Sequence, residues 1–299
     1  MIRRIKANQR KAFFILLLST TLLGFLLYLL ALYLQLPTTY LVIIAILTML
    51  SPWFLYYNSD KIVIKATGAR PATKEESAQL LNIVEELAIA TNLPLPKIYI
   101  VDDPAPNAFA TGRNPEHGVV AVTTGLLAKM DREALQGVIA HEMAHIQNRD
   151  TLVGTIVATI TSAIVFISDI GLRLALGSRR EKNSSSGPLL ILALVAVVLA
   201  PIGAMILRAT HSRSRESLAD ATAVKITRNP QGLKRALQIL ANDSTEIKKI
   251  SPSSSALWIE EPNPRNSKNR PSFISRLYAT HPPIEERIRE IEAIEKSAI

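Results

Sequence analysis

The chain has 299 residues, of which 48% are hydrophobic, and a formal net charge of +9. It contains no cysteine, which excludes disulfides and thiolate metal ligands, so any metal must be held by His, Glu or Asp side chains. No nucleic-acid-binding motif accompanies the basic charge, so no nucleic-acid partner is expected. The apolar residues lie in long uncharged blocks, and basic residues beside such blocks are typical of membrane proteins.

Two uncharged segments open the chain and define a first unit, residues 1–59. Residues 12–36 are long enough to cross a hydrocarbon core about 30 Å thick. Residues 37–59 follow almost at once, so the two segments are expected to be antiparallel transmembrane helices. Basic residues lie on both outer flanks but not in the turn between the segments, and the positive-inside rule therefore places both flanks in the cytoplasm.

Residues 60–150 form a second unit with the composition of a water-soluble domain. An amphipathic helix is expected ahead of Pro94, and Thr73 and Glu76 have the spacing of a capping box at its start. This unit is therefore expected to begin with a helix and to face water.

Two short runs in the same unit, residues 97–101 and 119–123, have the character of β-strands. The stretch between them holds several Pro and Gly residues and is expected to be a loop. A strand with a free edge can bind an extended polypeptide, which adds to that edge through backbone hydrogen bonds. An ordinary hairpin in a small sheet explains the pattern equally well.

The most informative stretch is His141-Glu142-Met143-Ala144-His145. Histidines four residues apart lie on one face of a helix, where both imidazoles can reach one zinc ion. Glu142 then lies beside the metal and can act as the general base toward a metal-bound water. Asp131 is expected to cap this helix. A chance match on a buried helix is the alternative, so further residues must complete the argument.

Residues 151–207 form a third, apolar unit with two uncharged runs joined by a polar linker. A second transmembrane hairpin here would bring the number of spans to about four. Asp169 and Arg173 interrupt the first run, and three basic residues in the linker contradict the positive-inside rule. A hairpin that lies shallowly in the membrane, or packs on the protein, is therefore the alternative.

The last unit, residues 208–299, is polar and is expected to be water-soluble. Helices are expected at residues 211–224, 232–240 and 284–294. Residues 251–270 are rich in Ser, Pro and Asn and are expected to be a long mobile loop.

A catalytic zinc ion usually has three protein ligands and one open position, so a third ligand is required. Asp150 lies about 140° around an ideal helix from His145 and is expected to point away from the metal. Glu216 is the best candidate, because it shares a helical face with Asp220, which can accept a hydrogen bond from a ligand histidine and fix its tautomer. Two solvated carboxylates on a surface helix are the alternative. If Glu216 is a ligand, the chain between it and the histidines crosses the membrane an even number of times.

Several stretches resemble, in order, the HtpX-type membrane zinc metallopeptidases, relatives of the CAAX-prenyl endopeptidases. They are the paired N-terminal apolar runs, residues 107–112, the histidine motif with residues 148–150, the apolar hairpin, residues 212–220 and residues 280–288. The resemblance implies a zincin-like (gluzincin) domain, α+β but mainly α, with a small sheet, embedded among about four transmembrane helices. It also implies one Zn²⁺ per chain, held by His141, His145 and Glu216, with Glu142 as the base. Ser217 departs from the family, which commonly has an aromatic residue there.

Five further residues are weighed with this resemblance in view. Asn107 lies where the family places a residue near the substrate, although Asn in a Pro-rich loop is commonly a turn former. His281 is a candidate to donate a hydrogen bond to the developing oxyanion, or simply to cap a helix. Arg215 is expected at the surface rather than paired in the site, and no role is expected for His117 and His211.

The sequence and its resemblance together predict an integral-membrane zinc endopeptidase that cuts misfolded or damaged membrane proteins in quality control. The expected location is the inner cell membrane, crossed several times, with the active site facing the cytoplasm. The expected partners are unfolded or membrane proteins and the lipid bilayer. A processing peptidase with few substrates is a narrower alternative. A non-catalytic adaptor is disfavoured, because a structural zinc site needs four ligands and no fourth is obvious.

Overall fold

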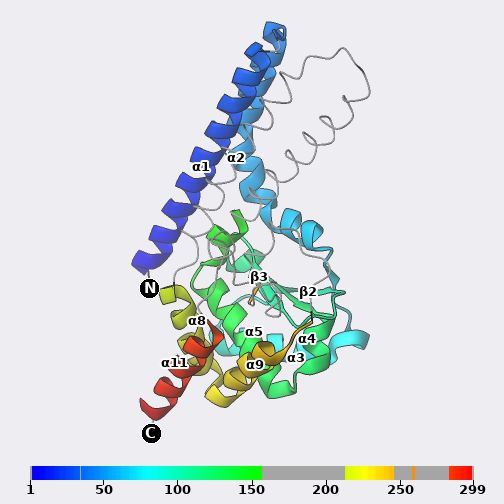
Figure 1. Cartoon of the computed structure of the whole chain (residues 1–299), viewed down its shortest axis with the longest axis vertical. Helices are drawn as coiled ribbons and strands as arrows, with labels where there is room; N and C mark the ends of the chain where they lie inside the picture. Colours follow the sequence, from blue (N-terminus) through cyan, green and yellow to red (C-terminus); the bar gives the residue numbers. More distant parts are fainter. Residues whose placement is uncertain (1, 34, 157–212, 246–257, 260–282, 298–299) are drawn as a thin grey trace.

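The computed structural model describes residues 2–33, 35–156, 213–245, 258–259 and 283–297. Helices α1 (Ile2–Tyr33) and α2 (Thr38–Thr67) form a long antiparallel rod, and the other elements pack together at one end of it (Figure 1). Those elements are β1 (Arg70–Pro71), α3 (Lys74–Thr91), β2 (Lys97–Val101), β3 (Ala108–Thr111), the 3-10 turn η1 (Pro115–His117), β4 (Val119–Thr123), α4 (Thr124–Lys129), α5 (Arg132–Gln147), α8 (Arg213–Thr227), α9 (Pro230–Asn242) and α11 (Ile284–Ser297). The expected α+β, mainly α, fold with a small sheet is confirmed.

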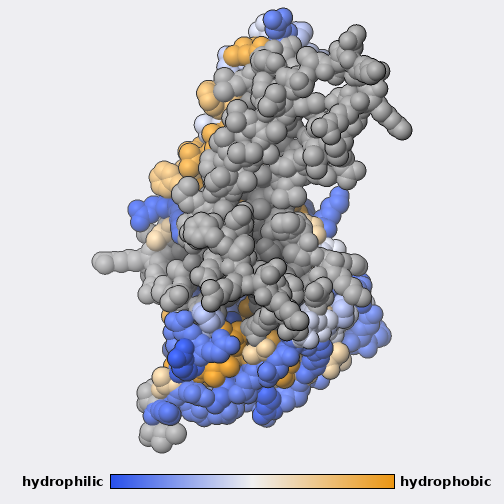
Figure 2. Space-filling view, viewed as in Figure 1, coloured by the Kyte–Doolittle hydropathy of each residue, from blue (hydrophilic) through white to orange (hydrophobic). Residues whose placement is uncertain are grey.

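The rod carries apolar side chains on its outside. Figure 2 shows hydrophobic residues along the rod and mainly hydrophilic ones on the described surface of the globular end. Within the described ranges, α2 is the one helix that is long and apolar enough to cross a membrane. The expected count of about four spans is therefore not confirmed. Both rod helices extend beyond the apolar runs of the sequence, and residues 157–207 lie outside the described part of the chain.

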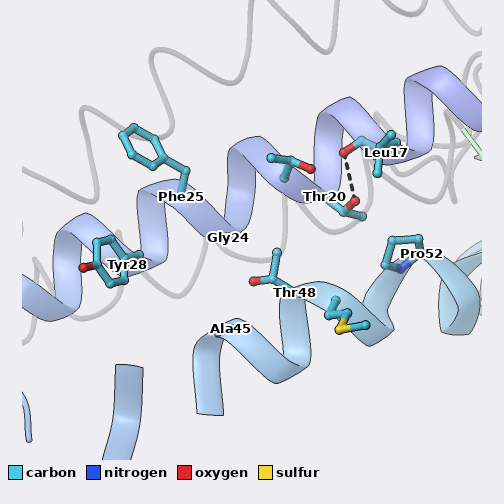
Figure 3. Close-up of a pocket in the computed structure, with 10 residues that line it drawn as sticks. Leu17, Thr20, Gly24, Phe25, Tyr28, Ala45, Thr48 and Pro52 are labelled. Atoms are coloured by element: carbon cyan, nitrogen blue, oxygen red, sulfur yellow. Dashed lines mark hydrogen bonds between the residues drawn. The ribbon is translucent and has the colours of Figure 1, made fainter. Parts of the chain in front are cut away.

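The two rod helices approach closely at Gly24. A Cβ atom placed there would lie 2.2 Å from the Thr48 Cγ2 atom, so a larger residue would push the helices apart (Figure 3). Pro52 lies inside α2 and has no N–H to donate to the Thr48 carbonyl one turn earlier. The Ser51 hydroxyl donates to that carbonyl instead, at 3.0 Å, which keeps the backbone satisfied in an apolar setting.

The sheet has the strand order β1-β2-β4-β3. Strands β2 and β4 have the bounds expected from the sequence, but they pair in parallel, with Tyr99 opposite Ala121. The loop expected between them contains β3, which pairs antiparallel with β4, so the loop prediction is wrong for residues 108–111. Because β4 lies between β2 and β3, it has no free edge, and the outer strand on this side of the sheet is β3.

Each face of the sheet packs against different elements. On one face, Ala108, Val120 and Ile100 belong to the main core, which also contains the buried residues of α3, α5 and α9. On the other face, Phe109 and Ala121 pack with Val63 of α2 and with Trp258. The sheet thus joins the core of the globular end to the end of the rod.

The helix with the histidine motif, α5, runs through the middle of the globular end. Its N-terminus is capped by Asp131, whose carboxylate accepts a hydrogen bond from the Ala134 N–H at 2.8 Å, as expected. Helix α9 approaches α5 closely, since a Cβ atom at Gly137 would lie 2.6 Å from the Leu233 nitrogen. Helices α3, α8 and α9 and strands β3 and β4 all pack against α5. The motif is therefore held on a rigid, buried helix.

Candidate active site

Most of the motif of α5 is buried, although three of its residues are polar. His141 is fully buried, Glu142 is 3% exposed and His145 is partly exposed. Burial of polar groups is costly unless each finds a partner. The partners come from α8 and α11, which follow α5 in the sequence by many residues.

Three side chains from two helices bring metal-ligating atoms together. The Nε2 atoms of His141 and His145 lie 3.2 Å apart, and the Glu216 carboxylate of α8 lies 3.6 Å from the first and 3.8 Å from the second. Zinc bonds of about 2.0–2.1 Å in tetrahedral geometry place ligand atoms about 3.3–3.4 Å apart. The observed spacing fits one ion held by two imidazoles and one carboxylate.

A buried carboxylate orients His141. Asp220, one turn after Glu216 on α8, has its Oδ1 atom 2.8 Å from the His141 Nδ1 atom, which leaves Nε2 facing the ligand cluster. Burial and the charge of Arg287 lower the pKa of His141, but the carboxylates of Asp220 and Glu216 outweigh them and raise it to about 9. This negative surrounding also favours a bound cation.

Arg287 of α11 is a site residue that the sequence did not point to. It is 1% exposed, and its Nε and Nη2 atoms donate to the two oxygens of Asp220 at 2.9 and 2.7 Å. Burial tends to raise the pKa of Asp220, yet Arg287 and His141 hold that pKa well below its usual range. Arg287 lies in the stretch 280–288 that resembles the family, and that resemblance is the sequence signal that could have pointed to it.

Two other acidic or basic residues lie near the cluster. Helix α5 ends at Gln147, so ideal helical geometry does not reach Asp150, whose carboxylate lies 3.6 Å from the His145 Nδ1 atom. The Nε2 atom of His145 is the one that faces His141 and Glu216, so Asp150 lies on the other side of the ring and, as expected, not toward the ligand cluster. Arg215 was expected at the surface but is partly buried: burial lowers its pKa, and the nearby charges of Asp150 and Glu216 oppose that change.

The remaining candidates fall in three groups. Asn107 is buried immediately before β3, and its Oδ1 atom accepts a hydrogen bond from the Ala108 N–H at 3.0 Å. His117 bonds within its own loop, with its Nδ1 atom 2.6 Å from the Asn114 side chain. His211 and His281 lie outside the described residues.

Strand β3 is tied to the segment that continues from α5. The Thr151 hydroxyl donates to the Gly112 carbonyl at 3.0 Å, and the hydroxyls of Thr111 and Thr155 lie 2.7 Å apart. Thr151 and Thr155 belong to the helical residues 151–156. The outer strand is thus fixed relative to the histidine motif by side-chain hydrogen bonds.

The family model described as Peptidase family M48 matches residues 74–295. The chain belongs to peptidase family M48. It is 41% identical over 293 residues to the "Protease HtpX homolog" of Caldanaerobacter subterraneus subsp. tengcongensis, covering 96% of this chain and 95% of that protein. The identity is 45% over 239 residues with the Tropheryma whipplei homolog, covering 79% of each chain. With the Streptococcus gordonii homolog it is 38% over 300 residues, covering 97% of this chain and 99% of the homolog.

Among solved structures, the "Crystal Structure of S. mikatae Ste24p" is similar with a TM-score of 0.43 and 20% identity, covering 98% of this chain and 67% of that chain. The family match and the HtpX homologues confirm the resemblance drawn from the sequence. This M48 chain is a metal-dependent, membrane-associated metalloprotease, and the cluster of His141, His145 and Glu216 is its candidate metal site.

Proposed function

We propose that this M48 protein is an integral-membrane, zinc-dependent endopeptidase that hydrolyses peptide bonds of misfolded or damaged membrane proteins. The observation that carries the proposal is the convergence of His141, His145 and Glu216 around one point, with Glu142 on the same helix. Two imidazoles and one carboxylate are a ligand set typical of catalytic zinc, and they leave a fourth position for water or substrate.

When bound, zinc supplies Lewis acidity and lowers the pKa of its water to about 7. Glu142 takes a proton at its carboxylate and later gives it to the leaving amine. Asp220 holds the tautomer of His141, and Arg287 holds Asp220 in place. His281 is proposed to stabilise the oxyanion, and Asn107 to lie at the substrate edge.

The proposed substrates are extended polypeptide segments, because an outer strand beside the metal helix can pair with any backbone. Strand β3 lies against α5 and is tied to residues 151–156, so a segment added along it would pass close to the motif. The apolar rod supports a place in the inner membrane. We propose a multi-pass topology with the active site facing the cytoplasm, and a role in protein quality control.

The test is cleavage of an unfolded model protein by the full chain, purified in detergent and loaded with zinc, beside Glu142→Gln. Loss of a general base is expected to lower the rate by about 10²–10⁴-fold. Both proteins are expected to hold one zinc ion per chain, because Glu142 is not a proposed ligand. His145→Ala is the matched control, since it is expected to lose both zinc and activity.

Two outcomes would contradict the proposal. Cleavage by Glu142→Gln at the wild-type rate would reject Glu142 as the base. Equal zinc in both proteins with activity in neither would reject a broad substrate range and favour a processing peptidase or an adaptor. Mapping the cuts made in cells separates these, since a processing enzyme leaves one dominant cut.

A further inference from the structure

The outer edge of β3 is already in contact with another part of the same chain. The Ile259 N–H donates a hydrogen bond to the Ala108 carbonyl at 2.9 Å. The ring of Trp258 packs edge-on against Phe109, with the ring centroids 4.8 Å apart. Trp258 is fully buried and Ile259 is 2% exposed, so this contact is tight.

The bonded carbonyl is one that faces away from the sheet. The Asn107 carbonyl accepts a hydrogen bond from the Thr123 N–H of β4, so it points into the sheet. Successive carbonyls along a strand point to opposite sides, and the next one, of Ala108, therefore points outward. Ile259 thus takes a position that a fifth strand would use.

The two side chains also alternate as those of a strand do. Trp258 packs on the face of the sheet that carries Phe109 and Ala121. Ile259 belongs to the main core on the opposite face, together with Ala108 and residues of α5. Consecutive side chains that lie on opposite faces are characteristic of an extended segment beside a sheet edge.

We propose that Trp258 and Ile259 are an internal competitor for the substrate edge of β3. The inference rests on the proposed function, in which an extended substrate pairs with this strand. A substrate that reaches the Ala108 carbonyl needs the space that Ile259 and Trp258 fill, so the two occupants exclude each other. Extended polypeptides are therefore cleaved only after they displace this pair, which lowers the activity of the resting enzyme.

The docked contact carries a cost that makes displacement easier. Within the described structure, the buried indole N–H of Trp258 has no hydrogen-bond partner. A buried donor without an acceptor destabilises the arrangement that buries it. Release of Trp258 lets this N–H reach water, so an arriving backbone competes with a contact that is not fully satisfied.

The first test removes the donor of the contact. Ile259→Pro has no N–H to give to Ala108, whereas Ile259→Val keeps the N–H and most of the volume. In the full-length, zinc-loaded enzyme, Ile259→Pro is expected to raise kcat/KM for an unfolded protein about fivefold, mainly through a lower KM. Ile259→Val is expected to stay within about twofold of the wild type. A kcat/KM of Ile259→Pro at or below that of Ile259→Val, with zinc content and Tm preserved, would overturn the proposal.

A second test does not depend on cleavage or on the fold of the proline variant. The chain has two tryptophans, so Trp53→Phe combined with Glu142→Gln leaves Trp258 as a single fluorescent reporter. Saturation with a dye-labelled, tryptophan-free unfolded polypeptide is expected to shift the fluorescence emission of Trp258 to the red, because its indole then meets water. Unchanged emission in the saturated complex would show that Trp258 stays docked and would overturn the proposal. Failure of the proposed function is seen separately, as absence of zinc-dependent cleavage by the wild type.

Discussion

The rod and the globular end place their residues in opposite ways. In the rod, large apolar side chains such as Trp53 and Phe54 are 66% and 62% exposed. In the globular end, charged and polar side chains such as His141, Asp220 and Arg287 are the buried ones. The difference reflects two surroundings, since lipid accepts apolar surface whereas water requires it to be covered.

The two regions also satisfy their polar groups differently. In the rod, the hydroxyls of Thr20 and Thr48 donate to backbone carbonyls four residues earlier on the same helix. In the globular end, Arg287 and Asp220 are bonded to each other across 67 positions of sequence. Hydrogen bonds within one helix keep that helix intact wherever it lies. Pairs between residues far apart in the sequence fix one helix against another and so hold the site together.

The largest effect is expected from removing one partner of the distant pair. Arg287→Met leaves the Asp220 carboxylate buried without its cation, which typically costs about 3–5 kcal/mol. It is also expected to weaken zinc binding about 10–100-fold, because His141 loses its oriented partner. Denaturant unfolding in detergent and zinc titration measure the two effects.

Arg289→Met is the matched control for that substitution. Arg289 lies on the same helix, is exposed, and bonds to the Glu285 carbonyl one turn earlier. Its loss is expected to change stability by less than about 0.5 kcal/mol. If the two variants unfold alike, the buried pair does not stabilise the site.

A smaller effect is expected from a charge on the surface of the rod. Leu47 of α2 is 61% exposed and Ile89 of α3 is 77% exposed, so the two look alike by exposure alone. Leu47→Asp is expected to cost about 2.5–3.5 kcal/mol of membrane insertion, because the carboxylate meets lipid. Ile89→Asp meets water and is expected to change stability by less than about 0.5 kcal/mol.

Fractionation of membranes and the yield of inserted protein measure the first variant, and denaturant unfolding measures the second. Equal insertion of Leu47→Asp and the wild type would mean that this face of α2 does not contact lipid. The pair of variants therefore separates lipid from water where accessible surface cannot.

Local patterns allowed part of the molecule to be predicted. The bounds of β2 and β4 and the cap at Asp131 follow from runs and spacings of a few residues. The capping box expected at Thr73 and Glu76 does not form, because Thr73 makes no side-chain cap bond. Arg70 binds the Glu76 carboxylate at 2.5 Å instead. The rule fails here because a charged neighbour outside the helix offers the carboxylate a stronger partner.

The parts of the fold and of the candidate site that were not predicted depend on contacts between residues far apart in the sequence. Strand β3 has four residues between Pro and Gly residues, and it is a strand because β4 pairs with it. Arg287 looks like a surface residue of a charged helix, and only the position of Asp220 makes it a buried one. The two histidines could be placed together by spacing, whereas the approach of Glu216 required the fold.

The smallest effect on stability is expected from removing the N-terminal cap of α5, which faces water. The N-terminus of α2, in contrast, has no side-chain cap bond. The Asp131 carboxylate accepts a bond from the Ala134 N–H and pairs with Arg235 at 2.5 Å, and both contacts lower its pKa. Asp131→Ala is expected to cost about 1 kcal/mol at pH 7, measured by denaturant unfolding in detergent.

The pH dependence of that loss separates the charge of Asp131 from its capping geometry. Because the pKa of Asp131 is lowered by folding, its contribution is complete above the ordinary Asp value of about 3.9 and is lost as the pH falls through the lower native value. The gap in stability between the wild type and Asp131→Ala is therefore expected to narrow below about pH 4. Asp131→Asn keeps a capping oxygen without the charge, so its gap to Asp131→Ala is expected to stay constant with pH. A wild-type gap that is equally constant would mean that the carboxylate stabilises α5 through geometry alone.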